Sequence, residues 1–419
     1  MTRQVLAIGL LILAGLTPAY STDPSTRPPE EESGVTLKEA ITKGKPILSF
    51  RYRYENVTDD AVGEKHARAS TLRTTFGYRS LPRKGLSFLI EGENVANIGN
   101  DLYNNNGLGD DHNGVTDRPV VADVANTGIN QAYGQYVIGE SQFRLGRTEI
   151  LVGDQRYVGN VAWRQNHQSF DAFTVRSNSL DWLSLFYSYI DNASRANWGN
   201  APMKTNLVNA GFKLGKVGTL TTYAYFLDYE QGNFFFQSTK TFGGEFMGSW
   251  RLNNKTTLLY ELEYADQADY GDNPADVSTD YIYLLGGIAF KPVQVSLAHE
   301  VLGGSLENGR FSTPLGTLHK WNGWADKFLT TPDQGLTDFY IQVDGQVFLE
   351  SSRKFMSWSV RYHDFESDED SIPYGTELDF ELFFFTHWGQ GFGLNGAFYK
   401  ADQFAADTTK IWIYTTYKI

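Results

Sequence analysis

Polar and apolar side chains alternate in about eighteen segments of this chain, each roughly eight to thirteen residues long. In the segment 47–55 one set of positions holds Leu48, Phe50, Tyr52 and Tyr54, and the other holds Ser49, Arg51, Arg53 and Glu55. Successive side chains on a strand point to opposite faces, so such a segment offers an apolar face to lipid and a polar face to a lumen. The pattern predicts an all-β fold, a transmembrane antiparallel β-barrel.

The connectors between these segments alternate short and long, which sets an orientation. Short turns of outer-membrane barrels face the periplasm and long loops face outward, so we expect an even strand number and two periplasmic termini. The alternative is a barrel of sixteen strands, in which one weakly patterned pair of strands near 142–176 is merged. The predicted strands cover 46–55, 67–79, 86–94, 129–138, 142–151, 168–176, 182–190, 206–214, 219–228, 241–251, 256–264, 280–289, 293–302, 337–348, 355–363, 376–385, 392–400 and 409–419.

The N-terminus has the features of a secretion signal. Arg3 precedes the apolar run Val5–Leu16, and small residues follow near Ala19, so residues 1–21 are predicted to be a signal peptide. The run is shorter than the roughly 20 residues that a spanning helix needs. Residues 22–45, rich in Pro, Glu, Ser and Thr, predict a mobile periplasmic leader, and 46–419 the barrel domain. Together these features predict a bacterial outer-membrane protein surrounded by lipid and lipopolysaccharide.

Composition excludes several classes of function. The 419 residues contain no cysteine, so disulfides and thiolate metal sites are excluded. No G-x-S-x-G elbow occurs and the seven histidines are scattered, so we expect neither an enzyme nor a cofactor. A net charge of -13 without a basic stripe argues against nucleic acid as a partner.

The acidic charge is concentrated in three long connectors, 95–128, 265–279 and 364–375, whose combined charge equals the net charge of the chain. The simpler interpretation is solubilising charge on exposed loops. The alternative is that divalent cations bridge these carboxylates to an anionic outer leaflet. The spacing does not match an EF-hand loop, so no defined metal site is predicted.

Charged residues of both signs fall on the predicted lumen face. Arg51, Arg53, Arg73 and Arg79 lie on the first two strands and should form one basic patch. Fixed charges in a narrow pore select ions by sign. The alternative is that arginines and carboxylates pair across the lumen and stiffen the wall.

Two blocks are more specific than the alternation. Asn130–Tyr133, Arg144–Arg147 and Gly153–Ala172 form the first, and Gly316–Phe328 forms the second. In these blocks the chain resembles the alginate export family of outer-membrane barrels. The resemblance implies an eighteen-stranded barrel that exports an anionic polysaccharide through an arginine-rich constriction. It also implies that Asp171 is an acidic lumen position beside an arginine.

The block 153–168 is predicted to be a loop that folds into the bore. Gly153 and Gly159 allow it to bend, so it either forms a constriction carrying Arg156 or Arg164 or a plug held by Trp163. The block 316–328, with paired tryptophans, is predicted to be an interfacial loop or a short helix that caps the outer mouth.

The sequence thus predicts a passive outer-membrane channel for anionic polysaccharide or small organic anions, with a periplasmic secretion partner in the first case. The alternatives are a general or neutral-solute porin and a receptor or adhesin barrel. The candidate pore-lining residues are Arg51, Arg53, Arg73, Arg144, Arg156, Arg164, Asp171 and Arg361.

Overall fold

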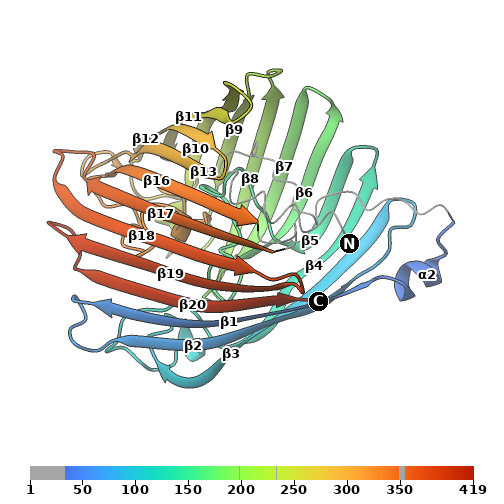
Figure 1. The fold of residues 1–419 in the computed structure, drawn as a ribbon. Helices are drawn as coiled ribbons and strands as arrows, with labels where there is room; N and C mark the ends of the chain where they lie inside the picture. The colour runs from blue at the N-terminus through green and yellow to red at the C-terminus, as the bar shows by residue number, and fades with distance from the viewer. Residues whose placement is uncertain (1–33, 198, 233, 349–353) are drawn as a thin grey trace.

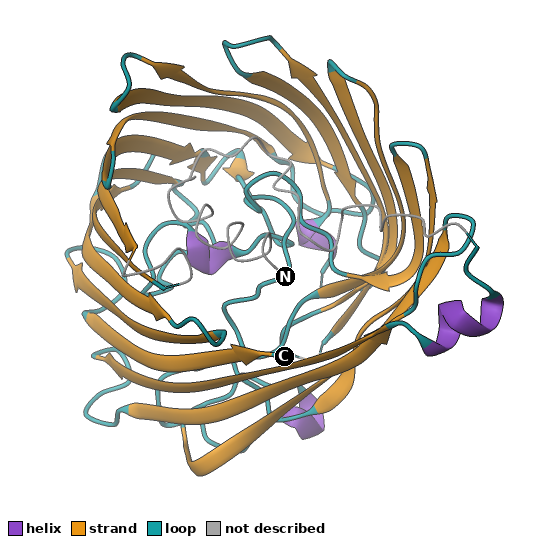
Figure 2. Cartoon of the chain, turned by 45° about the vertical axis from the view of Figure 1, so that its right-hand side comes forward, coloured by secondary structure: helices purple, strands orange, loops and turns teal. Residues whose placement is uncertain are grey.

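Eighteen antiparallel strands close into one barrel (Figures 1 and 2). The computed structural model describes residues 34–197, 199–232, 234–348 and 354–419. The wall strands are β1 (Lys45–Asp59), β2 (Ala67–Arg79), β3 (Leu86–Leu102), β4 (Thr127–Ile138), β5 (Ser141–Thr148), β6 (Ser169–Leu180), β7 (Leu183–Ser194), β8 (Asn200–Lys213), β9 (Thr219–Leu227), β10 (Thr239–Arg251), β11 (Thr256–Asp269), β12 (Ser278–Phe290), β13 (Val293–Leu302), β16 (Leu336–Phe348), β17 (Phe355–Glu366), β18 (Pro373–Phe385), β19 (Gln390–Ala401) and β20 (Thr408–Lys418).

Each wall strand pairs with its neighbours along the chain, and β1 pairs with both β2 and β20, which closes the sheet. The predicted fold class is therefore confirmed, with eighteen strands rather than the alternative of sixteen. The strands β5 and β6 remain separate because a 20-residue loop, 149–168, divides them. A closed wall leaves no unpaired edge, which is what lipid requires.

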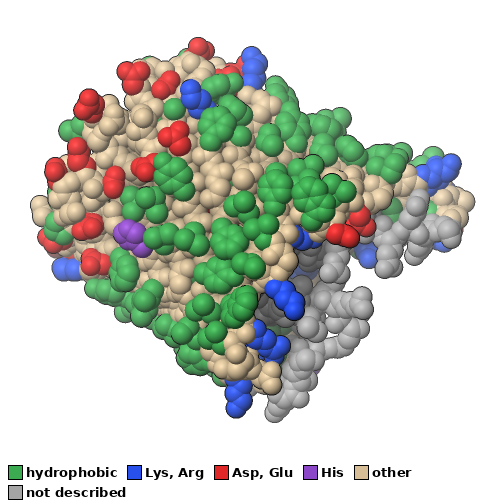
Figure 3. All heavy atoms as spheres, turned by 90° about the horizontal axis from the view of Figure 1, so that it is seen from above, with side chains coloured by type: hydrophobic (Ala, Val, Ile, Leu, Met, Phe, Trp, Pro, Cys, Tyr) green, Lys and Arg blue, Asp and Glu red, His purple; other side chains and the backbone are tan. Residues whose placement is uncertain are grey.

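Side chains alternate between the two faces as predicted. Phe76 and Leu145 are exposed on the outer face, whereas Arg53 and Glu55 are buried inside. Figure 3 shows hydrophobic side chains spread over one outer face, with acidic side chains concentrated toward its left-hand end. The apolar outer surface of a closed barrel confirms the predicted location in a bacterial outer membrane.

The two ends of the barrel differ. Both ends of the wall sequence, Lys45 and Lys418, lie at the end with short turns. That this end faces the periplasm stays a prediction. The predicted turn at 351–352 lies outside the described residues.

Long loops at the other end fold into the barrel. The segments 103–126, 149–168 and 303–335 enter the lumen, and Figure 2 shows loops inside the ring of strands. Buried apolar residues of these loops pack against inward side chains of the wall. The loop residues include Val158, Phe311 and Leu315, and the wall residues include Tyr281 of β12. The barrel therefore has a packed interior core as well as a wall.

Short elements complete the fold. The helix α2 (Leu37–Thr42) lies outside the barrel (Figure 1) and begins with a capping box between Thr36 and Glu39. The hydroxyl of Tyr78 holds the end of α2 by donating to the carbonyl of Ile41 at 2.6 Å. The other elements are η1 (Gly109–Asp111), η2 (Phe235–Gln237), η3 (Leu318–Lys320) and the hairpin of β14 (Gly304–Ser305) with β15 (Gly309–Arg310).

The N-terminal predictions are only partly covered by the structure. The signal peptide lies outside the described residues, and α2 occupies part of the segment predicted to be a leader without periodic structure. The capping-box pattern of Thr36 and Glu39 is the feature of the sequence that indicates this helix. Within the described chain, no helix combines the length and apolar character that crossing a membrane would need.

Candidate functional site: charged walls joined by two inward loops

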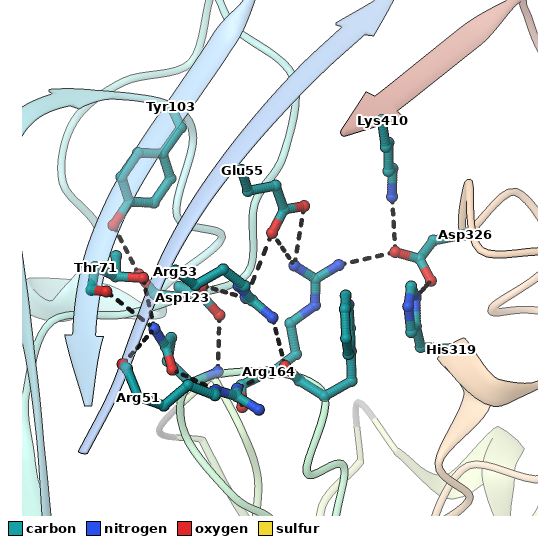
Figure 4. Close-up of polar contacts among 12 residues, drawn as sticks. Arg51, Arg53, Glu55, Thr71, Tyr103, Asp123, Arg164, His319, Asp326 and Lys410 are labelled. Carbon is teal, nitrogen blue, oxygen red and sulfur yellow. Dashed lines mark hydrogen bonds and ion pairs between the residues drawn. The ribbon is translucent and has the colours of Figure 1, made fainter. Parts of the chain in front are cut away.

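Arginines on β1 hold the loop 149–168 by its backbone (Figure 4). The guanidinium of Arg51 donates to the carbonyl oxygens of Ala162 and Trp163, both at 2.7 Å, and to Oε1 of Gln165 at 3.0 Å. The neighbouring Arg53 donates to the Trp163 carbonyl and forms an ion pair with Asp123. A planar guanidinium carries five N–H donors, so one arginine side chain can hold several oxygen atoms of the loop at once.

Arg164 lies at the centre of the ion-pair cluster in Figure 4. Its guanidinium nitrogens lie 3.2 Å from Glu55 and 2.8 Å from Asp326, and Lys410 of β20 lies 2.7 Å from the same Asp326 carboxylate. Burial alone would lower the pKa of Arg164, but Glu55 and Asp326 outweigh it and raise that pKa. The cluster ties β1 and β20 to two different loops.

Asp326 is a buried carboxylate that stays ionised. Burial would raise its pKa, but His319, Lys410 and Arg164 hold the pKa of Asp326 well below its usual range. His319 contacts Asp326 at 2.7 Å and stacks on Trp163, with ring centroids 4.6 Å apart. Trp163 of the loop 149–168 therefore packs against His319 of the loop 303–335.

Arg156 joins the same two loops at a second point. Its Nε lies 3.0 Å from Glu300 and its Nη2 donates to Oδ1 of Asn322 at 3.1 Å. The guanidinium also lies over the Trp321 ring, 5.1 Å from the centroid. Only 2% of the Arg156 surface is exposed, so this residue is enclosed in the loop packing.

Carboxylates on β18, three strands from β1 around the barrel, hold the loop 303–335. Asp379 and Glu377 of β18 accept hydrogen bonds from the backbone N–H groups of Trp324 (3.2 Å) and Ala325 (2.7 Å). Gly323 beside them has φ +82°, and a Cβ there would lie 2.4 Å from Glu377 Oε2. Only glycine fits this approach of the loop to the wall.

Three other predicted pore-lining residues, Arg73, Arg144 and Arg361, lie on the wall around the two inward loops. Arg73 is partly buried and lies 4.0 Å from Glu93. Arg144 donates to Gln135 at 2.8 Å and lies over Tyr133. Arg361 donates to the carbonyl of Lys320 at 3.3 Å and lies over Trp324. All three point into the lumen.

Asp171 differs from its predicted lumen position. It forms two hydrogen bonds of 2.8 Å with Arg147, its register partner, on the outer face that also carries Leu145 and Phe173. The inward neighbours Phe170 and Ala172 pack against the loops inside the barrel. Because apolar side chains fill the lumen at this end of β6, Asp171 points outward and pairs there with Arg147.

Sequence reasoning did not single out Asp123, His319, Asp326 or Lys410, although all four complete the cluster. The sequence could have placed Lys410 on the lumen face, since this residue falls on the face of the last strand opposite to Ile411 and Ile413. The block 316–328 was predicted to cap the outer mouth. In the structure it forms η3 and a turn inside the lumen that contact β18, β20 and the loop 149–168.

Three cations keep a charge that no carboxylate cancels directly. Within the described residues, the hydrogen-bond partners of Arg51, Lys320 and Arg361 are carbonyl or amide oxygens. Carboxylates also gather around a cavity bordered by Asp154 of the loop 149–168 and by Glu245 and Glu263 of the wall, and Lys320 is bonded to the carbonyl of the same Asp154. The lumen therefore carries fixed charges of both signs.

Known proteins match this chain by fold and not by sequence. No protein-family model and no curated protein matches it. The solved structures that resemble it include OccK1 (OpdK) of Pseudomonas aeruginosa, with a TM-score of 0.68 and 14% identity over 90% of this chain and 98% of that one. OccAB4 of Acinetobacter baumannii has a TM-score of 0.68 and 12% identity over the same shares. The fold is that of an Occ porin.

A further match is P. aeruginosa OpdK solved with vanillate, at a TM-score of 0.68 and 14% identity over 90% of this chain and 98% of that chain. Such identities establish the architecture and leave the transported solute open.

The resemblance to the alginate export family was wrong. No family model matches the chain, and its structural neighbours are Occ porins. The two blocks that suggested alginate export form the inward loops 149–168 and 303–335 and their flanks. Their tryptophans, glycines and arginines are explained by loop packing, which requires no particular exported polymer.

Proposed function

We propose that this protein is a passive outer-membrane channel that favours small organic anions. The observation that carries the proposal is the set of Arg51, Lys320 and Arg361, whose partners are neutral oxygens. Lys320 is exposed and Arg361 is partly exposed, so their charge can act on a solute, whereas Arg51 is buried against the loop 149–168. The solved structure of OpdK with vanillate, a barrel of the same fold, agrees with this solute class.

The physical basis is electrostatic focusing. A low-dielectric wall confines the field of a fixed charge, so a passing carboxylate is attracted and a cation of similar size is repelled. A carboxylate also exchanges part of its hydration for charge-assisted hydrogen bonds with a guanidinium. Two bonded loops cross the lumen, which favours small solutes over a polymer.

Reversal potentials in planar bilayers test the proposal. Under a KCl gradient we expect the wild-type channel to prefer chloride, and the double variant Lys320→Gln with Arg361→Gln to lose that preference. The effect should shrink near 1 M salt, where the Debye length falls to about 3 Å. Lys204→Gln is the matched control, because Lys204 is exposed on the outer surface and pairs with Glu230.

A cation-preferring or general porin is the second candidate. It is favoured by the acidic region of Asp154, Glu245 and Glu263, in which Glu245 and Glu263 are direct register partners. A cation preference in the wild type that disappears in Glu245→Gln would establish this candidate and reject the first.

A further inference from the structure

A second polar site lies where β3 and β4 meet the inward loop 149–168. Three carboxylates reach it, Glu91 and Glu93 from β3 and Glu149 from the loop. The Nδ2 group of Asn130 donates to Glu91 Oε1 at 3.0 Å and to Glu149 Oε1 at 2.6 Å, which brings these two carboxylates together. Glu93 accepts from the backbone N–H and from Nδ1 of His167, at 3.0 and 2.5 Å.

The site carries more negative than positive charge. Within the described residues, Arg73 supplies the one guanidinium at ion-pair distance from these three carboxylates, 4.0 Å from Glu93. Its Nη1 lies 3.1 Å from Nε2 of His167. The three carboxylates therefore outnumber the guanidinium that pairs with them.

Two buried amide oxygens at this site have no partner. Asn130 is 5% exposed and Asn166 is 2% exposed, and neither Oδ1 atom has a hydrogen-bond partner among the described residues. Their Nδ2 groups are engaged, that of Asn166 by the carbonyl of Val124 at 2.8 Å. Buried polar atoms are normally satisfied, so two orphaned acceptors in one place indicate a missing ligand.

Both asparagines border the same cavity. This small cavity is lined by Asn130 and Asn166 together with Glu93, His167, Ser169 and Ser194. Arg195 also borders it, but its guanidinium lies over the Phe234 ring, 5.4 Å from the centroid. The lining therefore offers oxygen atoms from one carboxylate, two amides and two hydroxyls, beside His167 and Arg195.

We propose that this cavity binds a Ca²⁺ ion. Calcium takes six to eight oxygen ligands, and carboxylate, amide and hydroxyl oxygens with a few waters supply that set. Among the described residues no three His, Asp or Glu side chains could hold a metal by themselves, so the two amide oxygens are essential ligands. Glu91 and Glu149 orient Asn130 and contribute charge from behind it.

The bound ion would join five segments of the chain. Its ligands come from β3, β4, the loop 149–168 and the adjoining ends of β6 and β7. The same loop carries Arg156 and Arg164, so calcium would stiffen the obstruction inside the barrel. This site is independent of the anion preference proposed above, because it shares no residue with Arg51, Lys320 and Arg361.

Calorimetric titration of the EDTA-treated full chain in detergent with CaCl₂ tests the site. We expect one Ca²⁺ with a Kd of about 10⁻⁴–10⁻³ M, the range of extracellular calcium modules. Asn130→Leu should weaken binding by tenfold or more, and Glu149→Gln by about tenfold, as loss of an outer-shell partner does. Asn209→Leu is the matched control, because Asn209 is also 5% exposed with an unpartnered Oδ1 but borders the other cavity.

Each other outcome overturns the proposal. No heat of binding up to about 10 mM Ca²⁺, well above the expected Kd, would mean that the cavity holds water. Equal binding by wild type and Asn130→Leu would place the calcium elsewhere, as on the acidic outer connectors. If Asn130→Leu does not give a heat-modifiable barrel, Ser169→Ala, which removes one hydroxyl ligand, should still weaken binding, whereas Ser188→Ala, a buried hydroxyl on β7 away from the cavity, should not.

Discussion

Individual charged residues inside this barrel hold loops in place. Arg51 of β1 donates to backbone carbonyls and Glu377 of β18 accepts from a backbone N–H group, so charged side chains of both signs hold the loops. Such bonds satisfy polar backbone groups that would otherwise lose hydrogen bonds inside the barrel. Most interior charges therefore serve the packing of the loops, and a few cations with neutral partners are left to act on solutes.

The Asp326 cluster gives a prediction about acid stability. Because the pKa of Asp326 is depressed in the folded protein, its contribution is full above the unfolded carboxyl pKa of about 4 and declines as the pH falls below that. Asp326→Asn should cost about 3–5 kcal/mol at pH 7, since it leaves Lys410 and Arg164 poorly paired. The difference from wild type should narrow at pH 3.

Denaturant unfolding in detergent at both pH values measures this difference. Asp402→Asn serves as the control, because Asp402 is exposed at the surface. A constant difference between wild type and Asp326→Asn from pH 7 to pH 3 would contradict the ionised state of Asp326.

Among the structural elements, the loop 303–335 depends on a close approach to β18. Gly323 has a backbone conformation that side chains rarely adopt, and it has no room for a Cβ beside Glu377. The bonds from Trp324 and Ala325 to the wall follow directly after it. A small change at this position should therefore loosen the whole loop.

Gly323→Ala should destabilise the loop by about 1–3 kcal/mol, the cost of a strained left-handed residue, and should raise the single-channel conductance or its fluctuations. Gly286→Ala is the control, since a Cβ at Gly286 in β12 meets nothing within 4 Å. Unchanged conductance in a correctly folded Gly323→Ala barrel would mean that this loop does not limit the pore.

Closure of the whole barrel depends on the last strand. β20 pairs with β19 on one side and with β1 on the other, over Ser49↔Lys418 to Asp59↔Thr408. Without β20 the edges of β1 and β19 would be left unpaired. Unpaired backbone groups are costly in lipid, and an exposed edge of a long apolar sheet promotes aggregation in water. Lys410 would also be lost from the interior cluster.

Deleting residues 408–419 should therefore abolish the folded barrel. We expect the truncated chain to accumulate as aggregate and to show no heat-dependent shift in gel mobility, whereas the full chain shows one. A heat-modifiable barrel formed by the truncated chain would show that β1 and β19 can close without β20.

The wall of the barrel follows from the amino-acid sequence. Alternation has a period of two residues and is local, so it correctly assigns Arg51 and Arg53 to the lumen and Phe76 to lipid. The inward bend of 153–168 was also predicted, because Gly153 and Gly159 allow the chain to fold back there. The wrong family assignment came from the same loops, whose residue types reflect packing more than transport.

The roles of the interior charges arise from tertiary packing. Loops have no period, so the contacts of Arg164 with Glu55 and Asp326, which lie 109 and 162 residues away along the chain, could not be derived from spacing. The outward position of Asp171 likewise depends on the apolar core that the loops create behind β6. Strand faces follow from local backbone geometry, whereas ion pairs inside a barrel depend on how distant loops fill the space that the wall encloses.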